Sequence, residues 1–431
     1  MLQIQKRLSA SFYAIISLPS TAMGFALSVQ ISALSWLLTT RYNLDIHEVG
    51  IVWAAGPLAG IFGQVIIGLI SDKVWFWGGR RRPFILIGGV LAASMLLALP
   101  NIDAIRSFFG IEGLLGVAIF VALTLDLAIN ISFNPTRSII ADVTPEGNPR
   151  TKGYTWMQTI SGFFGVLAYI IGAVFGNYIL IYSGVFVVLI FSILPVFFIA
   201  EERTLAAPKS ASTVADGETG ASTTKWRQLF RLYIAHAFSW IGVQTMFVYI
   251  IAYIQQKMTM GSDSSGILSG QVISISFAVL NTVGFILPGF VLEPIAEKLG
   301  RVRTHLGCVA IMAVGYFLIA FFGATPFALY ALMGVVGIGW GAIVSLPFAI
   351  MSENVDKGRM GFFMGIFNLS VVLPQLFVSL GLGILIQHAA DKNIIFLISG
   401  VSVALSAFFW FFVKEEKRDM VVSIAAEGAQ Q

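Results

Sequence analysis

The feature that most constrains this chain is a series of long apolar segments that recurs from one end to the other. Each has about 20 residues, the length that an α-helix needs to cross the hydrocarbon core of a bilayer. Only 11% of the residues are charged, against roughly 25% in soluble proteins, so the chain cannot cover a water-facing surface. We count twelve segments, at 11–38, 49–71, 84–100, 113–141, 155–176, 178–200, 229–254, 270–292, 305–323, 327–351, 361–387 and 394–413. The sequence therefore predicts an all-α integral membrane protein with twelve transmembrane helices.

A polar segment at 201–228 divides the chain into two halves. It is rich in Ala, Ser, Thr and Gly, a composition that cannot bury enough apolar surface to fold alone. We therefore expect a six-helix bundle at 1–200, a linker at 201–228, a second six-helix bundle at 229–413 and a tail at 414–431.

An internal repeat supports this division into pseudo-symmetric bundles. Six residues within and after the end of the second apolar segment of the first half recur 221 positions later. Parallel repeats of this kind, related by an axis along the membrane normal, build one large class of transporters. The pairs are Gly63 and Gly284, Gly68 and Gly289, Asp72 and Glu293, Gly79 and Gly300, Arg80 and Arg301, and Arg82 and Arg303.

The basic residues predict an orientation. Of the 26 Lys and Arg residues, four lie in loops on one side of the expected membrane: Arg41, Arg106, Lys257 and Lys392. The others lie near the opposite face, with both termini and the linker. Because cytoplasmic loops carry the excess of Lys and Arg, both termini are predicted to be cytoplasmic. The basic residues lie in short loops, which argues against a nucleic-acid partner. No cleavage site follows the first apolar segment, so we expect it to be retained.

Charged residues gather where the second segment of each half ends. In the stretch 68–84, Asp72 is able to pair with Arg80, Arg81 and Arg82, and Asp142 is a second candidate partner. We interpret this cluster as a cytoplasmic gate whose ion pairs hold one conformation. The alternative is that the arginines only set the topology. The expected gate comprises Asp72, Arg80, Arg81, Arg82, Arg137, Asp142, Glu293, Arg301 and Arg303.

Asp126 lies well inside the fourth apolar segment. A charge at that depth costs several kcal/mol, about 2.5 to 3.5 on insertion scales, so such residues usually face a cavity. At 100° per residue, Asn130, Phe133 and Arg137 share its helix face within about 40°. A carboxylate that takes and releases a proton near the midplane is what a proton-coupled carrier needs, and we predict that role for Asp126. The alternative is a buried aspartate satisfied by a neighbouring helix.

Amide and hydroxyl side chains in other spans are candidates for a substrate cavity. Asn368 and Gln375 are seven residues apart on one face of the eleventh segment, where they would bind either a solute or a neighbouring helix. Together with Asn130, the candidates are Gln30, Gln244, Tyr249, Asn368 and Gln375. His236 is expected at the cytoplasmic edge of the seventh segment. We find no phosphate loop, catalytic triad or metal-ligand spacing, so neither an enzyme nor a cofactor or metal site is expected.

At these residues the chain resembles the sucrose–proton symporter branch of the major facilitator superfamily. The resemblance rests on GRRRPFI (79–85) after SD (71–72), on the fourth segment, on SLPFA (345–349) and on GIFNLSVVLPQ (365–375). In the fourth segment it rests on LDLAIN (125–130), Pro135, Arg137 and the AD of 141–142. It implies the major facilitator fold, with Asp126 as the proton-carrying carboxylate and Asn130 and Arg137 as supporting residues.

A narrower resemblance is to the major facilitator proteins of bacterial magnetosome membranes, which are thought to move some form of iron. It rests on SASFYAIISLP (9–19), GFALSVQISALSWLL (24–38) and TKGYTWMQTISGFFGVLAY (151–169). No acid follows Trp240 and Ile241, where plant sucrose carriers have acidic residues. The two resemblances therefore imply a proton-coupled transporter of an iron species in a bacterial inner or magnetosome membrane. The alternatives are a disaccharide–proton symporter and a sensor or assembly factor that moves nothing.

Overall fold

The computed structural model describes residues 7–61, 70, 74–145, 148–201, 225–258, 266–355 and 360–414. Within these ranges the regular structure is helical, apart from one isolated antiparallel bridge between Phe76 and Gly79. Ten helices in the described ranges are long and apolar enough to cross a membrane, and two shorter apolar helices cover Ile46–Ile61 and Ile394–Trp410. The prediction of an all-α membrane fold is confirmed.

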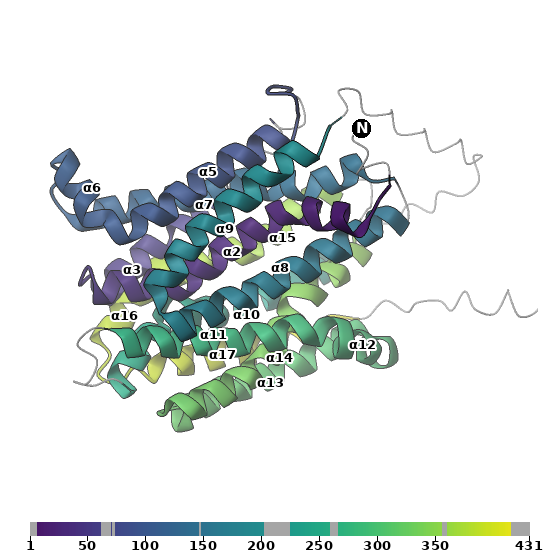
Figure 1. Ribbon diagram of the computed structural model, residues 1–431. Helices are drawn as coiled ribbons and strands as arrows, with labels where there is room; N and C mark the ends of the chain where they lie inside the picture. Colours follow the sequence, from purple (N-terminus) through teal and green to yellow (C-terminus); the bar gives the residue numbers. More distant parts are fainter. Residues whose placement is uncertain are drawn as a thin grey trace, which may run out of the picture.

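The first half of the chain occupies the upper part of Figure 1. Its long helices lie side by side, with α2 packed against both α8 and α9, and α5 packed against α7. Its helices are α2 (Ala10–Thr40), α3 (Ile46–Trp53), α5 (Arg82–Ala98), η1 (Leu99–Asn101), α6 (Ile102–Phe109), α7 (Leu114–Val143), α8 (Asn148–Phe175) and α9 (Asn177–Phe198).

Most of the second half forms the lower part of the same view, with α15 labelled higher, level with α2. Here α10 packs against α17, and α13 packs against α14. The helices are α10 (Trp226–Lys257), α11 (Ile267–Leu287), η2 (Pro288–Leu292), α12 (Glu293–Leu299), α13 (Arg301–Phe322), α14 (Pro326–Glu353), α15 (Met360–Phe377), η4 (Val378–Leu382), α16 (Gly383–His388) and α17 (Ile394–Trp410). The segments η2 and η4 are π-helical turns. Each follows directly on a membrane-spanning helix and continues its path.

Local sequence explains where several helices begin and end. Gly176 makes the whole turn between α8 and α9 with φ of 86°, a conformation that favours glycine. Asp45 and Glu48 form a capping box at the start of α3. Several boundaries differ from expectation. The third span continues through η1 and α6 to Phe109, because Pro100 falls in a helical turn that it does not break. α10 begins at Trp226, inside the expected linker.

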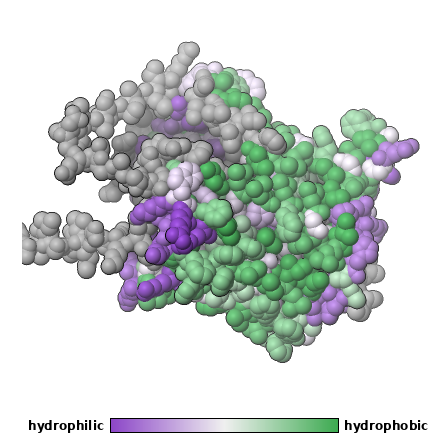
Figure 2. All heavy atoms as spheres, turned by 180° about the vertical axis from the view of Figure 1, so that it is seen from behind, coloured by the Kyte–Doolittle hydropathy of each residue, from purple (hydrophilic) through white to green (hydrophobic). Residues whose placement is uncertain are grey.

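The outer surface of the helices is apolar. Figure 2 shows a broad hydrophobic face, with hydrophilic residues gathered toward its ends. Large side chains such as Phe186, Phe290 and Phe408 are more than half exposed. A water-soluble protein would bury such residues, whereas hydrocarbon solvates them without cost and every helix satisfies its own backbone hydrogen bonds. These residues therefore form the lipid-facing surface.

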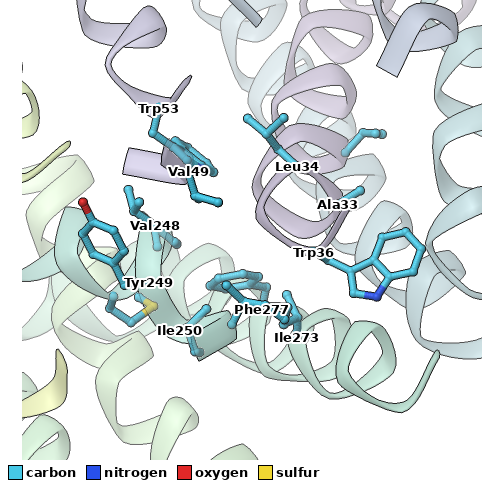
Figure 3. Close-up of a cluster of buried hydrophobic side chains, with 14 of the residues drawn as sticks. Ala33, Leu34, Trp36, Val49, Trp53, Val248, Tyr249, Ile250, Ile273 and Phe277 are labelled. Atoms are coloured by element: carbon cyan, nitrogen blue, oxygen red, sulfur yellow. The ribbon is translucent and has the colours of Figure 1, made fainter. Parts of the chain in front are cut away.

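The two halves meet through a buried apolar cluster. Leu34 of α2, Val49 of α3, Val248 of α10 and Phe277 of α11 belong to this cluster, and Figure 3 shows Val49 beside Val248. A hydrogen bond crosses this contact from Ser35 Oγ to the Val248 oxygen, at 3.0 Å. Leu34, Ser35, Val49 and Val248 lie in the parts of their helices that are remote from the linker, while Phe277 lies near mid-helix. We call the side remote from the linker the far side. The halves are thus joined on the far side, and this closure bounds a cavity deeper between them.

Candidate substrate cavity

A cavity of about 350 Å³ lies between the two halves. Its wall is formed by α2, α3 and α7 from the first half and by α10, α14 and α15 from the second. Six of the seven cavity residues expected from sequence, counting the proton site, line it together: Gln30, Asp126, Asn130, Gln244, Asn368 and Gln375. The structure therefore brings polar side chains from four helices to one space, of the size and mixed lining typical of small-molecule sites.

Asp126 is the one carboxylate among the described residues that line this cavity. It is 5% exposed. Its Oδ2 accepts a hydrogen bond from Gln30 Nε2 of α2 at 3.0 Å. Gly56 faces it, and a Cβ at that position would lie 3.4 Å from Oδ2, so the missing side chain leaves room beside the carboxylate. Within the described residues its partner is a neutral amide rather than a cation.

Asn130 lies one turn further along α7. Its side-chain nitrogen donates to the main-chain oxygen of Asp126 at 2.8 Å. This bond uses one of the amide's two N–H groups and turns the side chain back along the helix toward the main chain of Asp126. Asp126 and Asn130 therefore act as one polar patch on the cavity wall, as their spacing on the helix predicts.

Three tryptophans that the site expectations did not include also line the cavity: Trp53, Trp240 and Trp340. Each indole N–H donates to a protein acceptor. Trp53 bonds Ser35 Oγ at 2.7 Å and Trp340 bonds Asn281 Oδ1 at 3.2 Å, while Trp240 bonds a histidine ring nitrogen at 3.0 Å. Because the N–H groups are occupied, the rings offer the cavity their carbon surfaces. A lone tryptophan in an apolar span gives no sequence signal that separates such a role from packing.

Tyr249 is the exception among the expected cavity residues. It is fully buried, and its hydroxyl donates to the main-chain oxygens of Val378 and Ser379 at 3.1 and 3.3 Å. Gly50 of α3 approaches the same ring so closely that a Cβ there would lie 2.4 Å from the hydroxyl. The expectation that Tyr249 lines the cavity is wrong, because it faces the far-side contact between the halves.

The far side is closed by hydrogen bonds between the halves. Trp36 Nε1 donates to the Gly266 oxygen at 2.6 Å, and the hydroxyls of Ser32 and Ser274 lie 2.8 Å apart. The His47 N–H donates to Gln387 Oε1 at 3.2 Å. On the linker side, by contrast, a second cavity of about 610 Å³ lies between α2, α8, α11 and α14 and shares Trp340 with the first. The described conformation therefore holds the central cavity closed on the far side.

The arginine cluster at the start of α5 forms some of the expected ion pairs. Asp142 at the end of α7 accepts from Arg80 at 2.8 Å and from Arg81 at 3.2 Å. Arg82 donates to the main-chain oxygen of Val196 in α9. Asp72 lies outside the described residues. The ends of α5, α7 and α9 are thus tied together at one point.

Glu201 completes this cluster and was not among the expected residues. Its carboxylate accepts the main-chain N–H groups of Arg80, Arg81 and Arg82, each at 2.8 Å. The first N–H groups of a helix cannot bond within it, and at the start of α5 they donate to Glu201, where the helix dipole favours a negative charge. The acid directly follows the sixth span, so the sequence assigned it to the linker.

The other expected gate residues are arranged differently. The Arg137 guanidinium is exposed and lies 4.2 Å from the ring centre of Phe133, rather than against Asp142. In the second half, Arg301 and Glu297 line a small cavity of about 330 Å³, and Arg303 is exposed. The side chain of Glu293 lies outside the described residues.

Two helical bundles around a central, polar and aromatic cavity define an integral membrane transporter rather than an enzyme. The family model "Major Facilitator Superfamily" matches residues 16–378, with a second match over 268–429. The chain belongs to the Major Facilitator Superfamily and is a secondary transporter.

The curated relatives include plant sucrose carriers. The chain is 25% identical over 416 residues to sucrose transport protein SUC4 of Arabidopsis thaliana, covering 81% of this chain and 80% of the relative. It is 26% identical over 439 residues to sucrose transport protein SUT2 of Oryza sativa subsp. indica, covering 84% and 85%. The general alpha-glucoside permease of Schizosaccharomyces pombe is 31% identical over 174 residues, covering 36% and 31%.

Solved structures share the fold at low identity. The inward open conformation of the xylose transporter XylE from E. coli has a TM-score of 0.66 at 17% identity, covering 97% of this chain and 99% of that one. The peptide transporter POT in complex with sulfate has a TM-score of 0.68 at 13% identity, with 93% of each chain covered.

Proposed function

We propose that this chain is a proton-coupled sugar symporter that takes a pyranoside, such as a disaccharide, into its central cavity. The observation that carries the proposal is one cavity that combines a buried carboxylate with the ring surfaces of three tryptophans. Aromatic rings pack against the C–H faces of sugar rings, and amides and a carboxylate bind hydroxyl groups. The relatives found along most of the chain are sucrose carriers, which supports the same substrate class.

Asp126 is the proposed proton site. Its hydrogen bond from Gln30 leaves the second carboxylate oxygen without a hydrogen bond from the described residues. A carboxylic acid donates one hydrogen bond, whereas a carboxylate only accepts. Protonation therefore changes what this oxygen offers to a sugar hydroxyl, and this links solute binding to proton binding.

The proposed orientation places both termini and the linker in the cytoplasm of a bacterial cell, with the protein in the inner membrane. The excess of Lys and Arg on the linker side supports it. In that orientation the described conformation is closed to the outside.

An iron species is the other substrate that the sequence suggested, and the plant and yeast sugar carriers that the chain resembles do not support it. The cavity wall presents one carboxylate among its described residues, whereas a hard cation prefers several oxygen ligands. A magnetosome location gains no support from these relatives either.

The test is uptake of radiolabelled sucrose and maltose into proteoliposomes with an imposed pH gradient. We expect gradient-driven uptake by the native protein, and a loss of at least tenfold in Asp126→Asn, because the amide cannot carry the proton. Asp103→Asn, in α6 and remote from the cavity, is the matched control and should retain uptake. Uptake of chelated iron but neither sugar would overturn the proposed substrate, and full gradient-driven uptake by Asp126→Asn would overturn the proposed coupling.

A further inference from the structure

His236 lies one helical turn before Trp240 on α10 and is 2% exposed. Its Nε2 accepts the indole N–H of Trp240 at 3.0 Å. The imidazole also stacks on Phe367 of α15, with 4.8 Å between ring centres and 16° between planes. Trp240 meets Trp340 of α14 edge to face at 6.0 Å. His236 therefore connects α15 to a tryptophan on the cavity wall.

The hydrogen bond fixes the state of the imidazole. A ring nitrogen that accepts a hydrogen bond carries no proton, so the neutral ring is protonated at Nδ1. That nitrogen has no hydrogen-bond partner among the described residues. Among the described residues, the hydrogen bond of this side chain is thus the one to Trp240. A phenylalanine would pack against Phe367 equally well, so packing alone does not account for a histidine here.

We propose that His236 is a positioning residue that sets the orientation of Trp240 and thereby the shape of the solute site. Holding the indole N–H turns the ring surface toward the cavity and keeps the N–H from competing for solute oxygens. For its transport readout this inference rests on the proposed sugar transport.

Two variants separate the hydrogen bond from the packing. His236→Phe keeps an aromatic ring against Phe367 and removes the acceptor, while His236→Gln keeps an acceptor oxygen at a similar reach. We expect about a tenfold rise in KM for sugar in His236→Phe, from the loss of one buried hydrogen bond, with maximal rate changed by less than about twofold. His236→Gln should restore most of the native KM. Equal KM values in the two variants would overturn the proposal.

A double-mutant cycle with Trp240→Phe adds a second criterion. If His236 acts through Trp240, adding His236→Phe to Trp240→Phe should leave KM unchanged within about twofold, because the acceptor then has no donor to hold. If the two changes multiply instead, His236 acts by another route and the proposal is wrong.

A measurement made in the absence of solute tests this inference independently of the proposed function. In protein labelled with 5-fluorotryptophan, the ¹⁹F resonance of Trp240 is assigned by its absence in Trp240→Phe. We expect it to shift and broaden in His236→Phe and to stay near its native position in His236→Gln. An unchanged resonance in His236→Phe would refute the positioning role. A shifted resonance in a protein that takes up no sugar would leave the role intact and refute the proposed substrate.

Discussion

For several side chains of this protein, one hydrogen bond determines which atoms remain for contacts with their surroundings. Trp53 and Trp340 both donate their N–H groups to protein acceptors, so their carbon surfaces line the cavity. At Asp126 the described residues supply one amide hydrogen bond and leave the second carboxylate oxygen without one. The chemistry of the cavity therefore depends on which atoms the protein has already used, and residue types alone do not reveal that.

Asp391, in the loop between α16 and α17, gives a pH-dependent prediction. Its carboxylate accepts the N–H of Asn393 at 2.8 Å and pairs with Lys257 at 2.9 Å. Both contacts lower the pKa of Asp391, the backbone hydrogen bond more strongly. Because the folded pKa lies below the unfolded value of about 4, the stabilisation is present above that value and is lost as pH falls through the folded pKa.

The change Asp391→Asn should therefore lower Tm slightly at pH 7 and have no effect once the pH lies below the folded pKa. The side chain is 56% exposed, so we expect a loss of less than about 1 kcal/mol. Thermal unfolding of the purified protein across this pH range measures it, with Asp103→Asn as control. A difference that grows toward acid pH would contradict this assignment.

At the scale of elements, α5 is held at its start by a residue far away in sequence. Glu201 accepts three consecutive main-chain N–H groups at 2.8 Å, and Asp142 holds two of the arginines that carry them. The change Glu201→Gln removes the charge while keeping an acceptor oxygen. We expect a loss of about 1–2 kcal/mol, because charged acceptors form the stronger hydrogen bonds and the helix dipole favours them.

Chemical or thermal unfolding in detergent gives this value, and Glu112→Gln, an exposed acid after α6, is the matched control. If both variants unfold alike, Glu201 does not stabilise the start of α5.

The positions of the helices could be predicted because length and apolar composition determine what spans a bilayer. Asp126 and Asn130 could also be placed on one cavity face, since helical spacing determines that relation. Tyr249 and Glu201 could not be placed. The positions of both side chains depend on contacts between segments more than 100 residues apart, and periodicity within one helix carries no information about such contacts. For His236 the sequence suggested a cytoplasmic edge, whereas stacking on Phe367 buries it.

At the scale of the whole molecule, transport by alternating access requires the far side to open and close. In the described conformation α3 lies against α10 and η4, and Gly50 is a point of very close approach. A Cβ at Gly50 would lie 2.4 Å from both the Ser379 oxygen and the Tyr249 hydroxyl. The first of these is backbone and cannot move aside alone, so the contact depends on the absence of a side chain.

Gly50→Ala should therefore destabilise far-side closure while leaving each half folded. Overpacking of this kind costs about 1–3 kcal/mol, which corresponds to roughly a 5- to 150-fold shift between two conformations. The readout is the maleimide labelling rate of Thr39→Cys, whose native hydroxyl accepts from Gln255 across the far side. We expect labelling to accelerate when Gly50→Ala is added, and the native Cys308 contributes little because it is buried.

Gly116→Ala, where a Cβ meets nothing within 4 Å, is the control for that experiment. Gly116→Ala gains the same helix propensity as Gly50→Ala, because alanine favours a helix more than glycine does. It introduces no close contact, so we expect its labelling rate to stay unchanged. An unchanged rate in Gly50→Ala would mean that α3 does not limit the closure of the far side.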